Sequence, residues 1–293
     1  MASIVKTIVA TGASSGLGFE AVKQLLNQTQ PYKFLLGCSN TNTAQTAYDE
    51  LKYDSKKHSV TVLPLDLSDL RTVKKFAAQT LKQIGSDKLD FLFLNAATVK
   101  VANEPGVNGS KWSEPYVVNH LSQHYLIHLL REKLVESKSR LVITSSGAAT
   151  SVKDPSNFDK IFKAQSGADF FELYGPTKFA LLLSTHWWRR QLKGDCDVLA
   201  VSPGFIPDTG LARNSQFEFP PEVLKDAKTV ETGAQSLLAA FTRDDFPEDT
   251  DQVFLTSWGE WWPKEQIKLT LDKDLQDKWS PSKDQIEKEE LVD

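Results

Sequence analysis

The chain has 293 residues, of which 40% are hydrophobic and 25% are charged, and its formal net charge is -4 at pH 7. A chain of this kind can bury a sizeable core as one domain, and without a block of basic residues it is a poor candidate for nucleic-acid binding. The sequence lacks the run of about 18 apolar residues that spans a bilayer and lacks a cleavable leader, so we expect a cytoplasmic protein. Cys38 and Cys196 are too few for a disulfide framework, which fits a reducing compartment.

Apolar, β-rich runs alternate with helix-length segments along the chain. The predicted strands are Ile4–Ala10, Lys33–Cys38, Val60–Leu65, Leu89–Leu94, Arg140–Ser145, Val198–Ser202 and Val253–Ser257. The predicted helices between them are Gly18–Asn27, Thr43–Tyr53, Leu70–Ile84, Ser113–Glu136, Gly175–Leu192 and Val230–Phe241. This alternation is typical of buried parallel strands joined by crossover helices. We therefore predict an α/β, Rossmann-type doubly wound fold over residues 1–262, with a seven-stranded, mainly parallel sheet and helices on both faces.

Two irregular stretches interrupt the alternation, each just after the C-terminal end of a predicted strand. Residues 147–173 form a connection longer than the ~2–6 residues that is usual there, and residues 205–221 contain three prolines. Because open α/β sheets bind ligands at the C-terminal ends of their strands, both stretches are predicted to form walls of a substrate pocket. The charged tail, residues 263–293, has Trp279 and scattered aliphatic residues as anchors and is predicted to wrap the surface or to fray.

A glycine-rich segment follows the first predicted strand and opens the first predicted helix. It reads Thr11-Gly12-Ala13-Ser14-Ser15-Gly16-Leu17-Gly18. Glycines let the backbone turn sharply and approach a pyrophosphate, whose charge then lies at the positive N-terminus of the helix. Glycines also occur in loops for turn geometry alone, but the strand before and the helix after this segment favour a dinucleotide site.

The spacing G-x-x-x-G-x-G after a threonine resembles the compact branch of the short-chain dehydrogenase/reductase family. Further landmarks of that family follow in order: Asp66-Leu67, Asn95-Ala96-Ala97, Asn119, Ser145-Ser146, Tyr174-x-x-x-Lys178 and Pro203-Gly204. The resemblance covers residues 4–260. It implies an oxidoreductase that interconverts a carbonyl and an alcohol with a nicotinamide cofactor.

The resemblance assigns the two ends of the cofactor to separate segments. It implies that Asp66, with Leu67 beside it, accepts a hydrogen bond from the adenine amino group, and that Asn95 and Ala96 hold the turn beside the adenosine ribose. The residues alone also allow simpler roles, a helix N-cap at Ser68 or Asp69 and a turn-forming asparagine at position 95.

The segment after the sixth strand is implied to cap the nicotinamide. Its cofactor-binding residues would be Pro203, Gly204, Ile206 and Thr209. Asp208 stands where the family usually has a threonine, with Thr209 one position later.

The end of the second strand bears on the choice between NADP and NAD. An acidic residue there would bind the ribose 2'-hydroxyl and repel a 2'-phosphate, whereas Arg or Lys would pair with the phosphate. The sequence is Gly37-Cys38-Ser39-Asn40-Thr41, with neither kind of residue. Because no carboxylate repels the phosphate, and Ser39, Asn40 and Thr41 can hydrogen-bond to it, we predict NADP, with NAD as the less favoured cofactor.

Tyr174 and Lys178 are four residues apart, so their side chains share one face at the start of a predicted helix. A nearby ammonium favours the phenolate and lowers the pKa of the phenol, which makes Tyr174 the candidate acid/base. A tyrosine and a lysine at this spacing often occur together by chance, as a surface tyrosine and a solvated lysine. A chance occurrence is much rarer when the pair follows two serines at the end of a predicted strand. The resemblance implies further that Lys178 binds the nicotinamide ribose, that Ser146 orients the substrate oxygen, and that Asn119 holds a water in a proton relay.

The long gap from Ser146 to Tyr174 and the Asn-Ala-Ala turn resemble the subgroup of retinol dehydrogenases and light-dependent protochlorophyllide reductases. The latter carry a cysteine where this chain has Phe205, so protochlorophyllide is not implied as the substrate. Fungal-type reductases of secondary metabolism share the layout, and a secondary metabolite is one candidate substrate. Phenylalanines in the two irregular stretches predict an apolar or aromatic substrate: Phe158, Phe162, Phe170, Phe171, Phe205, Phe217 and Phe219.

Two groups of side chains have more than one interpretation. His120, His124 and His128 recur every four residues and could offer zinc ligands, but no carboxylate or cysteine cluster joins them, so we predict packing and no metal. The tryptophans at 187–188 and 258–262 could stack on an aromatic substrate, although large aromatic residues mostly serve packing or an interface.

Two other functions compete with the enzyme. One is a non-catalytic NADP(H) sensor that acts through a protein partner; sensors on this fold can lose the tyrosine or lysine, whereas this chain keeps both. The other is a scaffold subunit assembled through its tryptophans. For the enzyme we expect a small-molecule carbonyl or alcohol substrate, no nucleic acid, no membrane span, and a monomer or homodimer.

Overall fold

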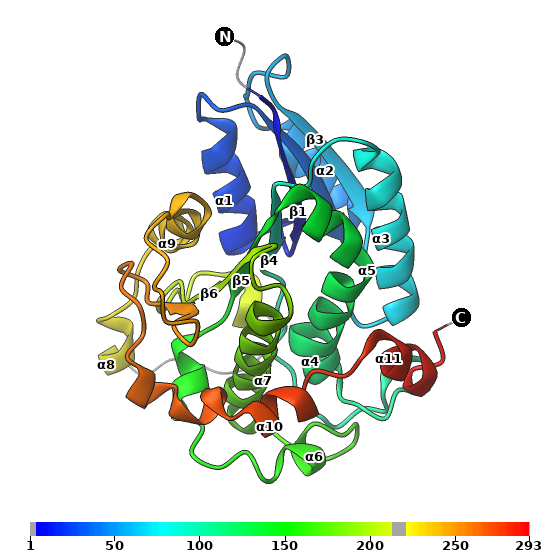
Figure 1. The fold of residues 1–293 in the computed structure, drawn as a ribbon, viewed down its shortest axis with the longest axis vertical. Helices are drawn as coiled ribbons and strands as arrows, with labels where there is room; N and C mark the ends of the chain where they lie inside the picture. Colours follow the sequence, from blue (N-terminus) through cyan, green and yellow to red (C-terminus); the bar gives the residue numbers. More distant parts are fainter. Residues whose placement is uncertain (1–3, 213–220, 293) are drawn as a thin grey trace.

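The computed structural model describes residues 4–212 and 221–292, and within them the chain folds around a parallel sheet (Figure 1). The strands are β1 (Lys6–Thr11), β2 (Tyr32–Cys38), β3 (Ser59–Pro64), β4 (Phe91–Leu94), β5 (Arg140–Thr144), β6 (Asp197–Val201) and β7 (Phe254–Leu255). Their order is β3-β2-β1-β4-β5-β6-β7, and every pair is parallel. From the central β1/β4 pair, the strand order therefore continues to β2 and β3 on one side and to β5, β6 and β7 on the other. Sheets of this kind bind ligands at the point where the strand order reverses.

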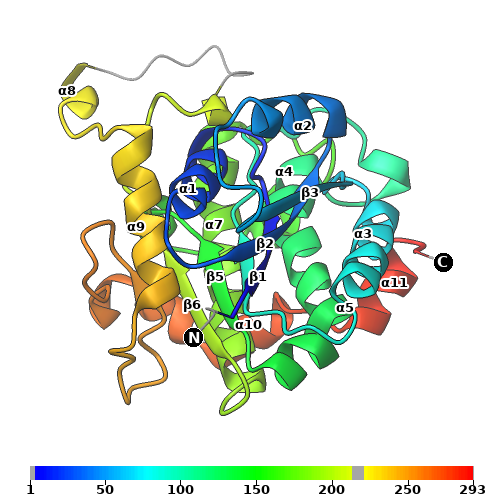
Figure 2. The ribbon, with the colours of Figure 1, turned by 90° about the horizontal axis from the view of Figure 1, so that it is seen from above.

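Helices cover both faces of the sheet. One face carries α1 (Gly16–Leu26), α2 (Thr41–Asp49) and α9 (Val230–Thr242), and the other carries α3 (Leu70–Ile84), α5 (Ser122–Ser137) and α7 (Phe170–Gln191) (Figure 2). Strand residues alternate between these layers: Ile8, Phe34 and Phe93 pack toward the first, and Val9 and Leu35 toward the second. Each face thus has its own apolar core, and the predicted fold class is confirmed.

The remaining elements are short. They are η1 (Val107–Gly109), α4 (Glu114–Tyr116), η2 (Val117–Leu121), η3 (Gly147–Ser151), α6 (Phe158–Ile161), η4 (Gly210–Ala212), α8 (Pro221–Leu224), η5 (Lys264–Gln266), η6 (Lys268–Leu271), α10 (Lys273–Lys278) and α11 (Lys283–Glu289). None of the helices in the described ranges is long and apolar enough to cross a lipid bilayer.

Two helix boundaries differ from the sequence-based expectation for identifiable reasons. The helix predicted over Ser113–Glu136 consists of α4, the π-helical turn η2 and α5. Helix α7 begins at Phe170 rather than Gly175, because Asp169 and Glu172 form a capping box in which each side chain accepts the other's backbone N–H at 3.0 Å. Tyr174 therefore lies in the second turn of α7 and not at its start.

Of the two behaviours predicted for the charged tail, wrapping over the surface is the one observed. In Figure 1 the orange and red segment crosses α7 at α10 and ends at α11 beside α5. Trp279 is 3% exposed and lies among the rings of Tyr116, Phe158 and Phe162. The tail therefore completes the core on the α5/α7 side of the sheet.

Candidate active site

A cleft of about 730 Å³ opens at the C-terminal ends of β1, β4, β5 and β6. Most of the predicted site residues line it: Gly12, Ser14, Ser15, Gly16, Leu17, Asn95, Ala96, Ser146, Tyr174, Lys178, Pro203, Gly204, Ile206 and Thr209. Outside its lining are Gly18, Ser39, Asn40, Asp66, Leu67 and Asn119. The ordering of the strands thus brings segments from across the sequence to one edge of the sheet.

The glycine-rich loop is packed directly onto the turn after β4. Gly12 has a φ of +65°, and a Cβ atom there would lie 2.5 Å from the Cα atom of Ala96. A Cβ atom on Gly18 would lie 2.2 Å from the main-chain oxygen of Gly12, which accepts a hydrogen bond from Asn95 Nδ2 at 2.9 Å. Gly12 and Gly18 are therefore required by contacts within the chain, and Asn95 serves as the side chain that joins the two turns.

Three side chains that hold this loop were missed by sequence reasoning as site residues. The Tyr48 hydroxyl donates to the main-chain oxygen of Ala13 at 2.6 Å. Thr11 Oγ1 donates to Gln123 Oε1 at 3.1 Å, and Gln123 Nε2 donates to the main-chain oxygen of Ala96 at 3.2 Å. Thr11 is part of the glycine motif, whereas neither Tyr48 nor Gln123 belongs to a local pattern that would have revealed it.

The N-terminus of α1 faces the cleft and fits an anionic group. Ser15, Gly16 and Leu17 line the cleft, and the first turn of α1 carries no acidic residue. The partial positive charge of this helix end and its first N–H groups are suited to a pyrophosphate. Together with the close approach that Gly12 and Gly16 permit, this geometry fits a dinucleotide.

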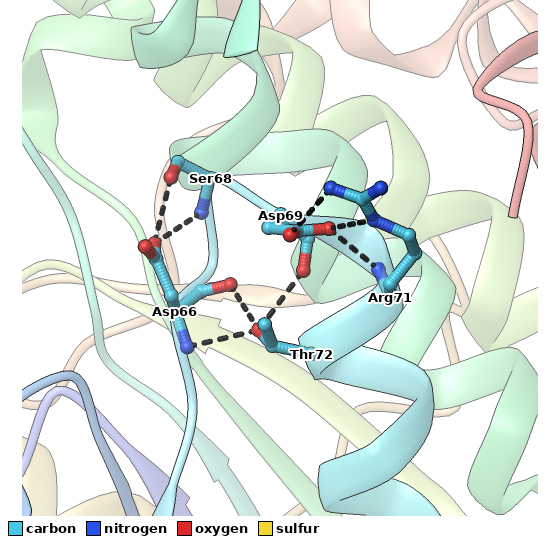
Figure 3. A network of polar contacts seen from close by, with 5 residues as sticks. All are labelled: Asp66, Ser68, Asp69, Arg71 and Thr72. Carbon is cyan, nitrogen blue, oxygen red and sulfur yellow. Dashed lines mark hydrogen bonds and ion pairs between the residues drawn. The ribbon is translucent and has the colours of Figure 1, made fainter. Parts of the chain in front are cut away.

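Asp66 follows β3 and organises the start of α3 (Figure 3). Its Oδ1 accepts hydrogen bonds from the backbone N–H and the hydroxyl of Ser68, at 2.9 and 2.7 Å. Thr72 Oγ1 accepts from the Asp66 N–H at 3.0 Å, while Asp69 caps α3 and pairs with Arg71. Asp66 Oδ2 makes no hydrogen bond with the described residues, so one carboxylate oxygen is left for a ligand. Leu67, next to it, is buried, and its main-chain oxygen accepts from Ser122.

The end of β2 carries the residues considered for the 2'-phosphate. Asn40 Oδ1 accepts from the Thr43 N–H at 3.0 Å and thus caps α2, and the neighbouring Ser39 is exposed. Burial raises the pKa of the Cys38 thiol to about 11, against the effect of its hydrogen bond with Ser14. Cys38 is therefore a neutral, buried thiol under ordinary conditions.

Ser146, Tyr174 and Lys178 meet at the end of β5. The Ser146 side chain lies close enough to Tyr174 to lower the pKa of the phenol, and Lys178 Nζ donates a hydrogen bond to the main-chain oxygen of Thr144 at 3.0 Å. Lys178 is 1% exposed, and burial lowers its pKa to about 8. The Ser145 hydroxyl instead donates to the main-chain oxygen of Lys178 at 3.3 Å, so of the two adjacent serines it is Ser146 that faces the tyrosine.

We expected the Lys178 ammonium to lower the pKa of Tyr174, and the structure shows that this expectation is wrong. Burial raises the pKa of Tyr174, and the nearby Ser146 side chain opposes this rise. The Lys178 ammonium lies 6.0 Å from the centre of the Tyr174 ring. Within the chain itself, therefore, desolvation outweighs the attraction of the ammonium for a phenolate.

Asn119 lies in the π-helical turn η2 and is fully buried. Its Oδ1 accepts from the Thr98 N–H at 2.7 Å, and its Nδ2 donates to the Thr98 oxygen at 3.0 Å and to Thr177 Oγ1 at 3.1 Å. These hydrogen bonds join the Asn119 side-chain amide to the turn after β4 and to α7.

The segment after β6 folds back toward the glycine-rich loop. Lys228 donates its backbone N–H to the Phe205 oxygen at 2.9 Å, and Thr209 Oγ1 donates to the Ile206 oxygen at 3.3 Å. A Cβ atom on Gly16 would lie 3.6 Å from Thr209 Cβ. Pro203 to Thr209 therefore borders the same space as the helix α1 N-terminus.

The prediction that seven phenylalanines line the pocket is partly wrong. Phe170, Phe171 and Phe205 line the cleft, but Phe158 and Phe162 are at most 1% exposed and pack in the core beneath Trp279. Phe217 and Phe219 lie outside the described residues. Trp258 and Trp262 also line the cleft, although the sequence favoured packing over substrate stacking for these tryptophans.

The three histidines of η2 and α5 lie in the core between α5, α7 and the tail. His124 Nδ1 accepts from Trp188 Nε1 at 2.9 Å, and the Nε2 atoms of His124 and His128 lie 2.9 and 3.1 Å from the Pro281 oxygen. Burial lowers the pKa of His120 to about 3 and that of His128 to about 4. In the described ranges, no group of three or more His, Cys, Asp or Glu residues is placed to hold a metal ion.

Comparisons with known proteins agree with this geometry. The family model described as short chain dehydrogenase matches residues 6–157. A short-chain dehydrogenase/reductase of Pestalotiopsis microspora is 58% identical over 288 residues, which cover 98% of this chain and 99% of that protein. Retinol dehydrogenase 12 of Homo sapiens is 30% identical over 241 residues, which cover 80% of this chain and 72% of that protein.

The likeness to solved structures supports the same fold at lower identity. The NADPH-bound carbonyl reductase from chicken fatty liver is 20% identical and gives a TM-score of 0.66, over 89% of this chain and 94% of that chain. From the family match, the relatives and the fold together, the chain belongs to the short-chain dehydrogenase family of oxidoreductases, which bind a nicotinamide cofactor, and to the retinol dehydrogenase-like group within it.

Proposed function

We propose that the chain is an NADP-dependent reductase or dehydrogenase that interconverts a carbonyl and an alcohol on an apolar or aromatic small molecule. The observation that carries this proposal is that Ser146, Tyr174 and Lys178 line one cleft together with the N-terminus of α1. A proton donor, a second hydroxyl and a buried cation thus border the space that a nicotinamide ring would enter. A secondary metabolite as the natural substrate stays a prediction.

Each catalytic side chain has a role that follows from its contacts. A bound nicotinamide cofactor supplies or accepts the hydride. Tyr174 gives a proton to the substrate oxygen during reduction and takes it back during oxidation, while Ser146 shares that oxygen and fixes its position. Lys178, held by Thr144, provides a positive charge that favours loss of the Tyr174 proton and offsets part of the cost that burial imposes on the phenolate. Asn119 holds the turn after β4 against α7 through its side-chain hydrogen bonds.

The preference for NADP rests on the charge at the end of β2. Neither the Ser39-Asn40 segment nor the first turn of α2 carries an acidic residue. A 2'-phosphate placed there would meet the positive end of α2 instead of a carboxylate. Asp66, after the next strand, would hold the adenine through its Oδ2 atom.

The test is oxidation of NADPH and of NADH, followed by absorbance, with aromatic and polycyclic ketones, quinones and aldehydes as substrates. Tyr174→Phe is expected to lower kcat/KM by at least about 100-fold and to leave the dissociation constant of NADPH unchanged. Tyr53→Phe is the matched control, because Tyr53 does not line the cleft. Turnover that survives in Tyr174→Phe would refute the acid/base role, and a preference for NADH would refute the cofactor assignment.

A further inference from the structure

An indole ring lies against the residue that follows Ser146. The Trp262 ring stacks on Phe254 with 4.7 Å between centroids and 7° between planes, and Trp262 Nε1 donates to Gln266 Oε1 at 2.7 Å. A Cβ atom on Gly147 would lie 3.2 Å from Trp262 Cη2. The indole is therefore held in one orientation, with its benzo edge at the Ser146 side of the cleft.

A second aromatic group adjoins Tyr174. The Phe170 ring lies 5.8 Å from the Tyr174 ring, and the Phe171 ring lies 5.0 Å from that of Phe170. Phe171 is 64% exposed, and so is Trp258 at 65%, whose ring lies 6.5 Å from that of Trp262. Each member of the Ser146/Tyr174 pair is thus flanked by aromatic side chains that line the same cleft.

The charge of the cleft restricts the kind of molecule that these rings can receive. Among the described lining residues, Lys178 is the one that carries a charge at neutral pH, and its ammonium is tied to the Thr144 oxygen. No carboxylate, guanidinium or imidazole in the described lining is placed to pair with a charged substituent. An uncharged substrate with large apolar faces matches this lining.

We propose that Trp258 and Trp262 are specificity-determining residues that bind a flat, uncharged aromatic ring system attached to the reacting carbonyl. This inference rests on the proposed function, since it places the carbonyl at Ser146 and Tyr174. Aromatic pairs at centroid distances of about 4.5–7 Å have a favourable interaction free energy beyond that of their buried area. This corresponds to roughly a two- to tenfold preference per pair for an aromatic over a saturated ring. A saturated ring of the same carbon skeleton fills the same space but lacks the stacking.

Trp261 provides the matched control on the same segment. Its ring packs toward Phe246, 6.0 Å away, and under the Arg243 guanidinium, 5.1 Å away. It does not line the cleft. Replacing it removes an indole next to Trp262 without changing the proposed binding surface.

The experiment compares acetylnaphthalene with acetyldecalin, its saturated counterpart. The dissociation constant of each ketone is measured by calorimetry on the protein saturated with NADP⁺, and kcat and KM are measured with NADPH. Native protein is expected to prefer acetylnaphthalene. Trp258→Ala and Trp262→Ala should each reduce that preference by roughly two- to tenfold, through the dissociation constant and KM rather than kcat. Trp262→Phe should keep most of the preference, and Trp261→Ala should keep all of it.

Unchanged preference in both Trp258→Ala and Trp262→Ala, or no binding of either ketone by native protein, would overturn the inference. If Trp262→Ala fails to bind NADPH, the preference measured for Trp258→Ala is the deciding result, because replacing the exposed Trp258 removes little packing. Selective, tryptophan-dependent binding without turnover would refute the proposed function and leave the binding surface standing. If Tyr174→Phe abolishes turnover but neither tryptophan substitution changes the preference for acetylnaphthalene, the proposed function is supported and the binding surface is refuted.

Discussion

The Lys178 ammonium donates a hydrogen bond to the main-chain oxygen of Thr144, 3.0 Å away at the C-terminal end of β5. This bond ties the one charged group of the described cleft lining to the central sheet. Because the ammonium is buried, its pKa falls from 10.5 to about 8. The group is thus poised to change charge in a range where pH is easily varied.

Stability is expected to rise with pH because of Lys178. Between a folded pKa of about 8 and the ordinary 10.5, the unfolded chain binds a proton that the folded chain has released. The free energy of unfolding of native protein should therefore gain about 2 kcal/mol over Lys178→Met between about pH 8 and about pH 10. Urea unfolding of both proteins at the two pH values measures this difference, and parallel curves would contradict it.

Gly12→Ala is expected to abolish NADPH binding and to cost at least about 2 kcal/mol more than Gly85→Ala. Both glycines have a positive φ, +65° and +58°, so the backbone strain of the two substitutions is similar. A Cβ atom on Gly85 meets nothing within 4 Å, whereas one on Gly12 meets the backbone of Ala96. Urea unfolding and a fluorescence titration with NADPH compare the two variants. Equal losses would show that strain alone matters.

Acid should destabilise the protein through its buried imidazoles. The His120 pKa is lowered from 6.5 to about 3 by burial, so the stability it contributes is present above pH 6.5 and is lost as pH falls toward 3. Replacement by phenylalanine, His120→Phe, should reduce the slope of stability against pH by about 1.4 kcal/mol per pH unit in that window. Both His120 ring nitrogens lack a hydrogen-bond partner in the described structure, so the variant should not lose stability at neutral pH. An unchanged slope would contradict this assignment.

Trp279→Ala is expected to cost about 3–5 kcal/mol of unfolding free energy, as large core truncations do. Its indole fills the space between α4, α6 and the tail, where Phe158 and Phe162 would otherwise be exposed. Trp258→Ala, at a largely exposed position, should cost less than about 0.5 kcal/mol. Denaturant unfolding of both variants measures the contrast. A small cost for Trp279→Ala would mean that the tail adds little to the core.

The strand pattern and the motifs that follow strand ends could be predicted from sequence because they are local. Ser146, Tyr174 and Lys178 meet as expected, since parallel strands deliver their C-terminal ends to one edge. The β1 prediction began at Ile4, whereas pairing starts at Lys6, where β1 first aligns with Tyr32 of β2. Such ends depend on the neighbouring strand and not on the segment itself.

Burial that depends on distant segments could not be predicted in the same way. Phe158 and Phe162 lie in a polar stretch that was assigned to the pocket, yet Trp279, more than a hundred residues later, covers them. Tyr48 and Gln123 likewise act on the glycine-rich loop from α2 and α5, without a spacing that marks them. The capping box of Asp169 and Glu172 was readable from the sequence and would have placed the α7 start correctly.

The glycine-rich loop is held by Tyr48, Asn95 and Gln123 through bonds that the polypeptide makes with itself. Its shape therefore does not have to be created when a ligand arrives, and little conformational entropy is lost there on binding. Affinity for the dinucleotide can then depend on side chains that never touch it. Loosening the loop at Tyr48 would weaken binding through the greater disorder of the free protein, while every direct contact in the complex stays in place.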